Sequence, residues 1–286
     1  MGMQRVLSTY VFAEQPLTTV LLAEIARANI PSMEIFCAPA HFNYRAPEAV
    51  RKLADWLGEH KLQVHSLHAP TERDLSPGRE SGVPISISDT ERVRRLDAVD
   101  EIKRALEVAE RIPFRFLVQH LGHGRQAHDS RRLDAAFNSL EHLVVFAKQR
   151  GVTIALENTP GELAAPSSLA HFIHDTHLND LRLCFDTGHA HIEDGVEGSF
   201  EIMRERVVTT HIHDNHGQKD EHLVPFEGTI DWDVTLQNLA AAPQPLPLVL
   251  ELREHTGQGT MLERAAAAFE KLELRLAAKR APAASD

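Results

Sequence analysis

The segment HIHDNHGQKDEH, residues 211–222, contains four histidines, three acidic residues and one lysine. Imidazole nitrogens and carboxylate oxygens bind divalent transition metals, and the same groups transfer protons near neutral pH. A lone histidine or carboxylate more often makes a structural hydrogen bond or a salt bridge, so a single one would carry little weight. Their concentration in one segment, which continues as LVPFEGTIDW, indicates metal chemistry.

Residues of the same kinds end five further apolar runs, which are typical of β-strands. If these strand ends share one rim, their charges meet in one cavity, which is unfavourable unless a cation neutralises them. The pattern therefore predicts a divalent metal, and the lack of thiolates favours zinc, manganese, cobalt or iron. The runs are SLHAP, LVQHLGHG, IALENTPG, CFDTGHAH and LVLELRE, and with the segment above they supply His68, His120, Glu157, Asp186, His189, His211 and Glu251.

Five other histidines lie beside these candidates in the sequence: His65, His123, His191, His213 and His216. We interpret them as structural or supporting residues rather than ligands. The argument is clearest for His65, because side chains along a strand alternate between its two faces. An odd separation from His68 then places His65 on the opposite face.

The rest of the sequence predicts a scaffold that brings many strand ends to one rim. Short β-rich runs alternate with segments of helical period, such as 17–28, 47–60, 90–111 and 133–150. No glycine-rich phosphate loop follows the first strand, which favours an α/β fold of the (β/α)8 TIM-barrel type over a doubly wound sheet. Eight strands are expected, at Arg5–Tyr10, Ser32–Cys37, Gln63–His68, Phe114–His120, Thr153–Glu157, Leu181–Asp186, Val207–His213 and Pro247–Glu251.

The length and composition agree with a single domain. A barrel of this type often reaches 286 residues without dividing, and 43% hydrophobic with 25% charged residues is the balance of a globular protein. We expect the barrel to span residues 1–276 and residues 277–286 to fray. The Pro-, Gly- and Ser-rich connection at 69–88 is expected to cover the site as a lid.

Charge and cysteine content limit the partners and the compartment. Thirty Lys+Arg against 41 Asp+Glu give a net charge of −11, which argues against nucleic acid as a partner. Cys37 and Cys184 each lie in an apolar run and are expected to be buried rather than paired, which suits a reducing cytoplasm. No apolar run approaches the ~20 residues that span a bilayer. We expect a cytoplasmic enzyme with a small-molecule substrate, and a homo-oligomer is compatible with the sequence.

Five motifs carry a resemblance to a known family: LEN at 156–158, FDTGH at 185–189, HIHD at 211–214, DEH at 220–222 and LELRE at 250–254. With them the chain resembles the xylose isomerase-like barrel superfamily over about residues 5 to 275. That superfamily contains sugar isomerases and epimerases, inositol-pathway dehydratases, hydroxypyruvate isomerase and abasic-site nucleases of the endonuclease IV type. The motifs are specific for the superfamily and say little about the substrate.

The resemblance implies one to three divalent ions, zinc, manganese or cobalt. The epimerase branch shares a ligand set that matches Glu157, Asp186, His211 and Glu251. The nuclease branch adds two further zinc ions. Its first zinc corresponds to His68 and His120 with Glu157 bridging, and its third zinc to His189, Asp220 and His222.

For the sugar branch the resemblance implies isomerisation or epimerisation of a ketose, a sugar phosphate or a related keto-polyol. The reaction would proceed through a metal-stabilised enediolate. Glu157 and Glu251 would transfer the proton, one as base and the other as acid, and His189 would hydrogen-bond the developing oxyanion. The substrate partner is therefore expected to be a small carbohydrate.

The alternative is a zinc-dependent abasic-site phosphodiesterase of the endonuclease IV type, which the nine matched positions favour. Three departures oppose it. HAPT at 68–71 lacks the expected tyrosine, Gly188 replaces a cysteine, and FEGTIDW replaces a glycine-rich stretch. The sugar branch has a departure of its own, because its arginine corresponds to Gly217, and Lys219 or Arg253 would have to replace it. A structural metal site in a binding protein is disfavoured, since such sites are usually closed by four ligands.

Overall fold

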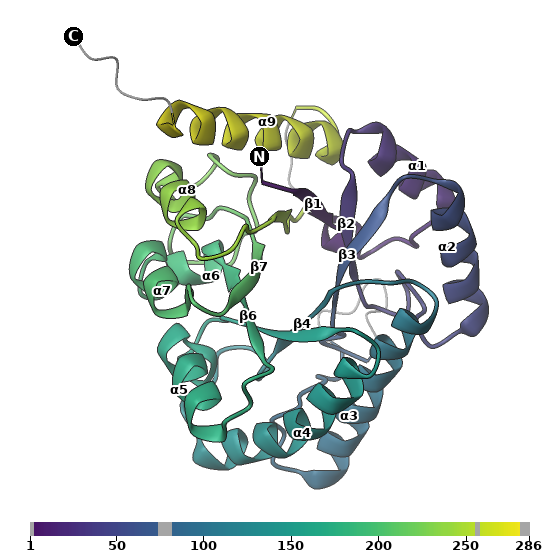
Figure 1. Ribbon diagram of the computed structural model, residues 1–286, viewed down its shortest axis with the longest axis vertical. Helices are drawn as coiled ribbons and strands as arrows, with labels where there is room; N and C mark the ends of the chain where they lie inside the picture. Colours follow the sequence, from purple (N-terminus) through teal and green to yellow (C-terminus); the bar gives the residue numbers. More distant parts are fainter. Residues whose placement is uncertain (1–2, 74–81, 255–257, 281–286) are drawn as a thin grey trace.

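The computed structural model describes residues 3–73, 82–254 and 258–280. Eight parallel strands surround a common axis and helices cover their outer side (Figure 1). The strands are β1 (Arg5–Ser8), β2 (Ser32–Phe36), β3 (Gln63–His68), β4 (Phe116–His120), β5 (Thr153–Glu157), β6 (Arg182–Asp186), β7 (Val207–His211) and β8 (Leu248–Leu250). The helices are α1 (Thr19–Arg27), α2 (Pro47–Glu59), α3 (Arg92–Glu107), α4 (Ser130–Lys148), α5 (Pro166–Thr176), α6 (Thr187–Ile192), α7 (Val196–Met203), α8 (Trp232–Ala240) and α9 (Met261–Arg280), with short 3-10 helices η1 (Thr9–Phe12), η2 (Val108–Glu110) and η3 (Glu162–Ala164).

The barrel closes through the pairing of its first and last strands. The strand order is β7-β6-β5-β4-β3-β2-β1-β8, and β1 pairs with β8. Between β7 and β8 a parallel bridge joins Ile212 to Leu250 just beyond the end of β7. Its hydrogen bonds run from Ile212 N to Val249 O at 2.8 Å and from Glu251 N to Ile212 O at 3.2 Å. The predicted (β/α)8 barrel is confirmed.

Several element ends differ from the predicted ones because capping side chains set them. The first strand ends at Ser8, whose hydroxyl caps η1 by accepting from Tyr10 N. Helix α4 begins at Ser130, earlier than expected, because the Asp129 carboxylate accepts from Arg131 N. Helix α9 continues to Arg280, past the expected end of the barrel at 276, and residues 281–286 lie outside the described residues.

The connection expected to form a lid is described only at its two ends. Its segment 74–81 lies outside the described residues. An antiparallel bridge joins Glu72 to Pro84, and Ile85 N donates to Thr71 O at 2.8 Å. Ile87 on the returning segment is fully buried. The ends of the connection are therefore fixed to each other and to the core, and whether it covers the site stays a prediction.

The barrel interior is built in layers by residues two apart on each strand. The middle layer contains a small apolar cluster of Val118, Ala155 and Cys184, all fully buried. Two residues further along the same strands, the top layer holds His120, Glu157 and Asp186. A separate apolar core fills the space between the strands and the helices. No helix within the described residues is long and apolar enough to span a membrane.

Candidate metal centre

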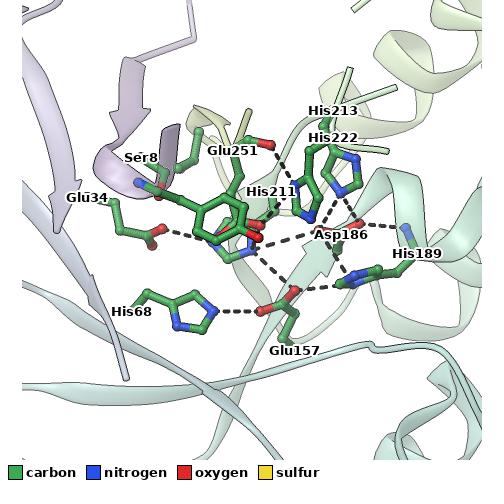
Figure 2. Close-up of polar contacts among 12 residues, drawn as sticks. Ser8, Glu34, His68, Glu157, Asp186, His189, His211, His213, His222 and Glu251 are labelled. Atoms are coloured by element: carbon green, nitrogen blue, oxygen red, sulfur yellow. Dashed lines mark hydrogen bonds and ion pairs between the residues drawn. The ribbon is translucent and has the colours of Figure 1, made fainter. Parts of the chain in front are cut away.

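The carboxyl ends of six strands bring their polar side chains to one rim, as Figure 2 shows for most of them. Five of the positions are the last residues of β3 to β7, and the sixth directly follows β8. Because parallel strands all end on the same side of a barrel, these side chains meet above its interior. The residues are His68, His120, Glu157, Asp186, His211 and Glu251.

The first group of potential ligands surrounds one nitrogen of His211. Its Nδ1 lies 3.3 Å from Glu157 Oε1, 3.4 Å from Glu251 Oε2 and 3.9 Å from Asp186 Oδ2. All four side chains are buried, and one ligand atom from each lies within 4.8 Å of the others. Glu157 Oε1 and His211 Nδ1 have no hydrogen-bond partner among the described residues.

The other nitrogen of His211 is held by Glu34, a residue that the sequence analysis did not identify. His211 Nε2 lies 3.1 Å from Glu34 Oε1, and Ser66 Oγ donates to Glu34 Oε2 at 2.8 Å. Burial raises the pKa of Glu34, but attraction to His211 and hydrogen bonds from His211 and Ser66 bring this pKa down to about 2. Glu34 is therefore ionised and accepts the Nε2 proton, so Nδ1 is the nitrogen that faces the other carboxylates and that could bind a metal after losing its proton.

The second group lies around the other oxygen of Glu157. His68 Nε2 is 3.4 Å and His120 Nε2 is 3.1 Å from Glu157 Oε2. His68 Nδ1 donates to the carbonyl of Ala69 at 2.8 Å, so its Nε2 lone pair points at the carboxylate. His68, Glu157 and His211 form a compact potential metal site, whereas His120 contacts Glu157 from a partly exposed position outside that set.

The third group gathers around Asp220. His222 Nε2 lies 3.0 Å and His189 Nε2 3.5 Å from Asp220 Oδ2. The Nδ1 atoms of both histidines donate to backbone carbonyls. His222 Nδ1 donates to Glu251 O at 2.9 Å, and His189 Nδ1 donates to Asn158 O at 3.0 Å. A carbonyl only accepts hydrogen bonds, so each Nδ1 carries a proton and each Nε2, which could hold a second proton or a metal, faces the carboxylate.

His213, which we interpreted from the sequence as a structural or supporting residue, lies within this third group. It is fully buried, and its Nε2 lies 3.0 Å from Asp186 Oδ1 and 3.9 Å from Asp220 Oδ1. A compact potential metal site contains His189, His213, Asp220 and His222. The signal was present in the sequence, because His213 is two positions from His211 and shares its side of the strand.

This arrangement of donors fits a divalent cation. Imidazole lone pairs that face carboxylates in a buried site repel them unless a proton or a cation lies between. Protonation is one solution: burial lowers the pKa of His189, but Asp186, Asp220 and Glu157 raise it well above its usual value. A metal ion is the other, and nitrogen and carboxylate oxygen donors without thiolate suit zinc, manganese or cobalt.

Comparison with known proteins agrees with this fold. The family model of the xylose isomerase-like TIM barrel matches residues 22–274. The chain belongs to the xylose isomerase-like TIM barrel family. The Methanocaldococcus jannaschii protein MJ1311, itself uncharacterized, is 31% identical over 81% of this chain and 78% of its own length.

Solved structures show the same fold. A D-tagatose 3-epimerase-like protein is 25% identical, with a TM-score of 0.80 over 98% of this chain and all of its own. An L-ribulose 3-epimerase, 19% identical, has a TM-score of 0.79 over 98% of this chain and 96% of its own. A third neighbour, the IOLI protein, is 17% identical over 98% of this chain and 100% of its own, has a TM-score of 0.78 and was solved with a bound zinc atom.

Two glycines of this xylose isomerase-like barrel make room for the site. A Cβ on Gly188 would lie 2.0 Å from Cε1 of His213, so only glycine lets the imidazole pack there. A Cβ on Gly228 would lie 2.3 Å from Oδ1 of Asp214. That carboxylate accepts from four donors in the loop after β7 and at the start of α8, namely Asn215 N, Phe226 N, Ile230 N and Trp232 Nε1. The glycines of DTGH and FEGTIDW are therefore needed to leave space for two side chains of the HIHD segment.

The remaining histidines lie outside the three groups, as expected. His191 Nε2 contacts Thr229 Oγ1 at 2.9 Å, and His216 Nδ1 contacts Glu221 Oε2 at 2.9 Å, both in exposed positions. His123 is half-buried and belongs to none of the three groups. His65 was placed correctly outside the site for the wrong reason. A bulge between β2 and β3 turns it toward the interior, where its Nε2 contacts Thr209 Oγ1 of β7 at 3.2 Å.

A cavity of about 410 Å³ opens beside the second and third groups. Such a volume is within the range of small-molecule sites. Arg253 lies nearby and donates to Tyr10 Oη at 2.7 Å, while the Tyr10 ring lies 5.0 Å from that of His222. The cavity is lined in part by His120, Thr159, His189, Gln218, Lys219 and Asp220.

Proposed function

We propose that this chain is a divalent-metal-dependent isomerase or epimerase of a ketose or a related keto-polyol. The observation that carries the proposal is the position of Glu157 and Glu251, two buried carboxylates from strand ends β5 and β8 that meet at His211 Nδ1. Two carboxylates beside one substrate are what a proton transfer between carbon atoms or faces requires. Family membership and the 25% identical D-tagatose 3-epimerase-like structure support the same reaction class.

The chain's own residues would divide the work as follows. Glu157, Asp186, His211 and Glu251 would hold the ion, which supplies Lewis-acid stabilisation of the negative charge that develops on the substrate oxygens. One of the two glutamates removes the carbon-bound proton and the other delivers a proton to the product. His189 would donate a hydrogen bond to the charged oxygen through Nε2, for which it must carry a second proton because its Nδ1–H is held by Asn158 O.

The cavity beside the site fits a small polar substrate. Thr159, Gln218 and Lys219 provide hydrogen-bond donors on its wall, and His120 and His189 form the side next to the proposed ligands. Lys219 is exposed and stands two positions after Gly217, where the sugar branch carries an arginine. We assign Lys219 to a substrate hydroxyl or phosphate oxygen.

Deuterium exchange tests the proposed function. The purified protein, loaded in turn with manganese, cobalt or zinc, is incubated with a panel of ketoses and ketose phosphates in deuterium oxide, and recovered sugars are analysed by NMR. We expect deuterium at the carbon next to the carbonyl with at least one sugar. Glu157→Gln and Glu251→Gln should each abolish exchange, whereas Glu197→Gln, on the exposed face of α7, should leave it unchanged. Near-normal exchange by either site variant would remove that glutamate from the mechanism.

A second candidate, the abasic-site phosphodiesterase, is favoured by one observation. His68 and His120 around Glu157, and His189 and His222 around Asp220, would suit two further zinc ions. In that case His189 Nε2 is a ligand and carries no proton. Metal-dependent incision of an abasic duplex, three zinc ions per chain by elemental analysis and no sugar exchange would together replace the first proposal with this one. We expect one ion and no incision, because the chain carries a net charge of −11.

A further inference from the structure

A second cavity, of about 670 Å³, lies at the opposite, amino-terminal end of the strands. Phe116, Thr153 and Arg182 line it as the first residues of β4, β5 and β6. Arg182 is four positions before Asp186 on β6, which separates this basal cavity from the metal ligands by about 13 Å of strand. The basal cavity is therefore distinct from the proposed catalytic site.

The charges around the basal cavity are of one sign. Its described lining residues include Arg115, Arg182 and His65 but no aspartate or glutamate. Within the described residues neither arginine forms an ion pair, and the neighbouring Asp180 is paired with Lys148 at 2.9 Å. On a chain of net charge −11, two arginines at one cavity with no acidic residue in its described lining are unusual.

Local contacts hold these groups in place. Arg182 Nη1 donates to Asn179 O at 2.7 Å and to Leu181 O at 2.9 Å, which anchors one side of the guanidinium. The Arg115 guanidinium carbon lies 5.4 Å from the centre of the Phe116 ring. A fixed guanidinium loses less side-chain entropy when it binds an oxyanion, so Arg182 is prepared for a ligand, and Arg115, which is exposed, adds a second positive charge to the cavity wall.

His65 provides a third, deeply buried polar group. It is 6% exposed, lines the basal cavity, and contacts Thr209 Oγ1 through Nε2 at 3.2 Å. Its Nδ1 has no hydrogen-bond partner among the described residues. When the Thr209 hydroxyl donates to Nε2, Nδ1 carries the proton and offers a donor to the cavity.

We propose that the basal cavity binds an organic oxyanion, a carboxylate or a phosphate ester of metabolite size. The oxyanion would accept hydrogen bonds from Arg115, Arg182 and His65 Nδ1. The apolar part would lie against Phe116 and the segment 239–247, which contributes leucine, alanine and proline side chains to the wall. The volume is within the range of sites that enclose a small organic molecule.

Isothermal titration calorimetry with phenyl phosphate, inorganic phosphate and phenol tests this proposal. We expect phenyl phosphate to bind with a Kd at least tenfold lower than that of either other probe, because only it fills both parts of the cavity. Arg115→Gln combined with Arg182→Gln should raise that Kd at least thirtyfold. Arg92→Gln, which removes the same charge from an exposed position on α3, should change it less than twofold.

Two checks keep the outcome decisive. Circular dichroism melts without probe establish that each variant is folded, and the single variants, each expected to weaken binding at least fivefold, replace the double variant if it unfolds. If the parent and Arg115→Gln/Arg182→Gln bind phenyl phosphate with equal affinity, the probe binds elsewhere and the proposal is overturned. So would absence of phenyl phosphate binding to the parent protein.

Discussion

Replacing Glu34 should weaken metal binding although the residue is not a proposed ligand. Its Oε1 accepts the Nε2 proton of His211, and both side chains are fully buried. That hydrogen bond fixes the imidazole orientation and makes Nδ1 a stronger donor to a metal. Glu34→Ala removes the acceptor and leaves a buried N–H unpaired, whereas Glu34→Gln keeps an amide oxygen for His211 and an amide N–H for Ser66 Oγ.

The two variants are therefore expected to differ in size of effect. An unpaired buried donor destabilises by about 1–3 kcal/mol, and loss of such a supporting carboxylate weakens metal affinity by about 10- to 100-fold. We expect Glu34→Ala to weaken zinc affinity by about 100-fold, the upper end of this range. Glu34→Gln loses only the negative charge and its hydrogen bonds persist, so we expect a weakening of about tenfold.

Competition with a chromophoric chelator measures the zinc affinity of each variant. Glu101→Gln is the matched control, because Glu101 is also a buried glutamate that accepts hydrogen bonds, from Tyr44 and Arg45, but lies on α3. It should lower thermal stability and leave zinc affinity within twofold of the parent. If Glu34→Ala binds zinc as tightly as the parent while folded, the argument that Glu34 orients His211 is refuted.

Three further predictions concern packing and pH. Gly188→Ala should destabilise by about 3 kcal/mol and weaken zinc binding, because its Cβ would lie 2.0 Å from the His213 ring; an unchanged melting temperature would contradict this. Asp214→Asn should destabilise by about 2–4 kcal/mol in denaturant titrations, since an amide cannot accept from all four donors that surround Asp214; wild-type stability would refute it. Burial lowers the pKa of His65 from 6.5 to about 4. As the pH falls, His65 is therefore protonated in the unfolded chain before it is protonated in the folded one, and the free energy of unfolding decreases between these two pH values. At pH 5 the loss in free energy of unfolding due to His65 is about 2 kcal/mol, and His65→Gln should remove this loss. Parallel curves of stability against pH for the parent and His65→Gln would count against this prediction.

The order and type of the strands could be predicted because β-rich runs and helical segments alternate so regularly. Where the strands end could not, since side-chain caps decide it. Ser8 ends β1 by capping a 3-10 helix, and Asp129 starts α4 before its apolar period begins. Such caps depend on one backbone angle and one hydrogen bond, which hydrophobic periodicity does not report.

Seven of the nine proposed ligands could be picked out because each stands at, or just after, a strand end, whereas Asp220 and His222 lie in the loop after β7 and were indicated by the DEH motif. Glu34 escaped notice because it lies inside the apolar run MEIF, where a pattern search expects only core. For His65, the face of the strand on which it lies was predicted wrongly. Strict alternation fails at the bulge between Met33 and Glu34, and the bulge turns His65 inward to contact Thr209. Bulges and buried carboxylates become visible only when the partner strands are known.

The separate motifs of this family act as one unit in the folded chain. Gly188 in FDTGH lacks a Cβ because His213 of HIHD occupies that space, and His213 in turn contacts Asp186, the first polar residue of FDTGH. Asp214 of HIHD holds the FEGTIDW loop through Phe226 N and Ile230 N. A larger side chain at one of these contacts would therefore displace its neighbour in another motif. The glycine that stands in FDTGH in place of a cysteine, Gly188, leaves space for His213. Gly188 and His213 depend on each other in the folded chain, so their presence reports the local packing of Asp186 more directly than it reports a substrate.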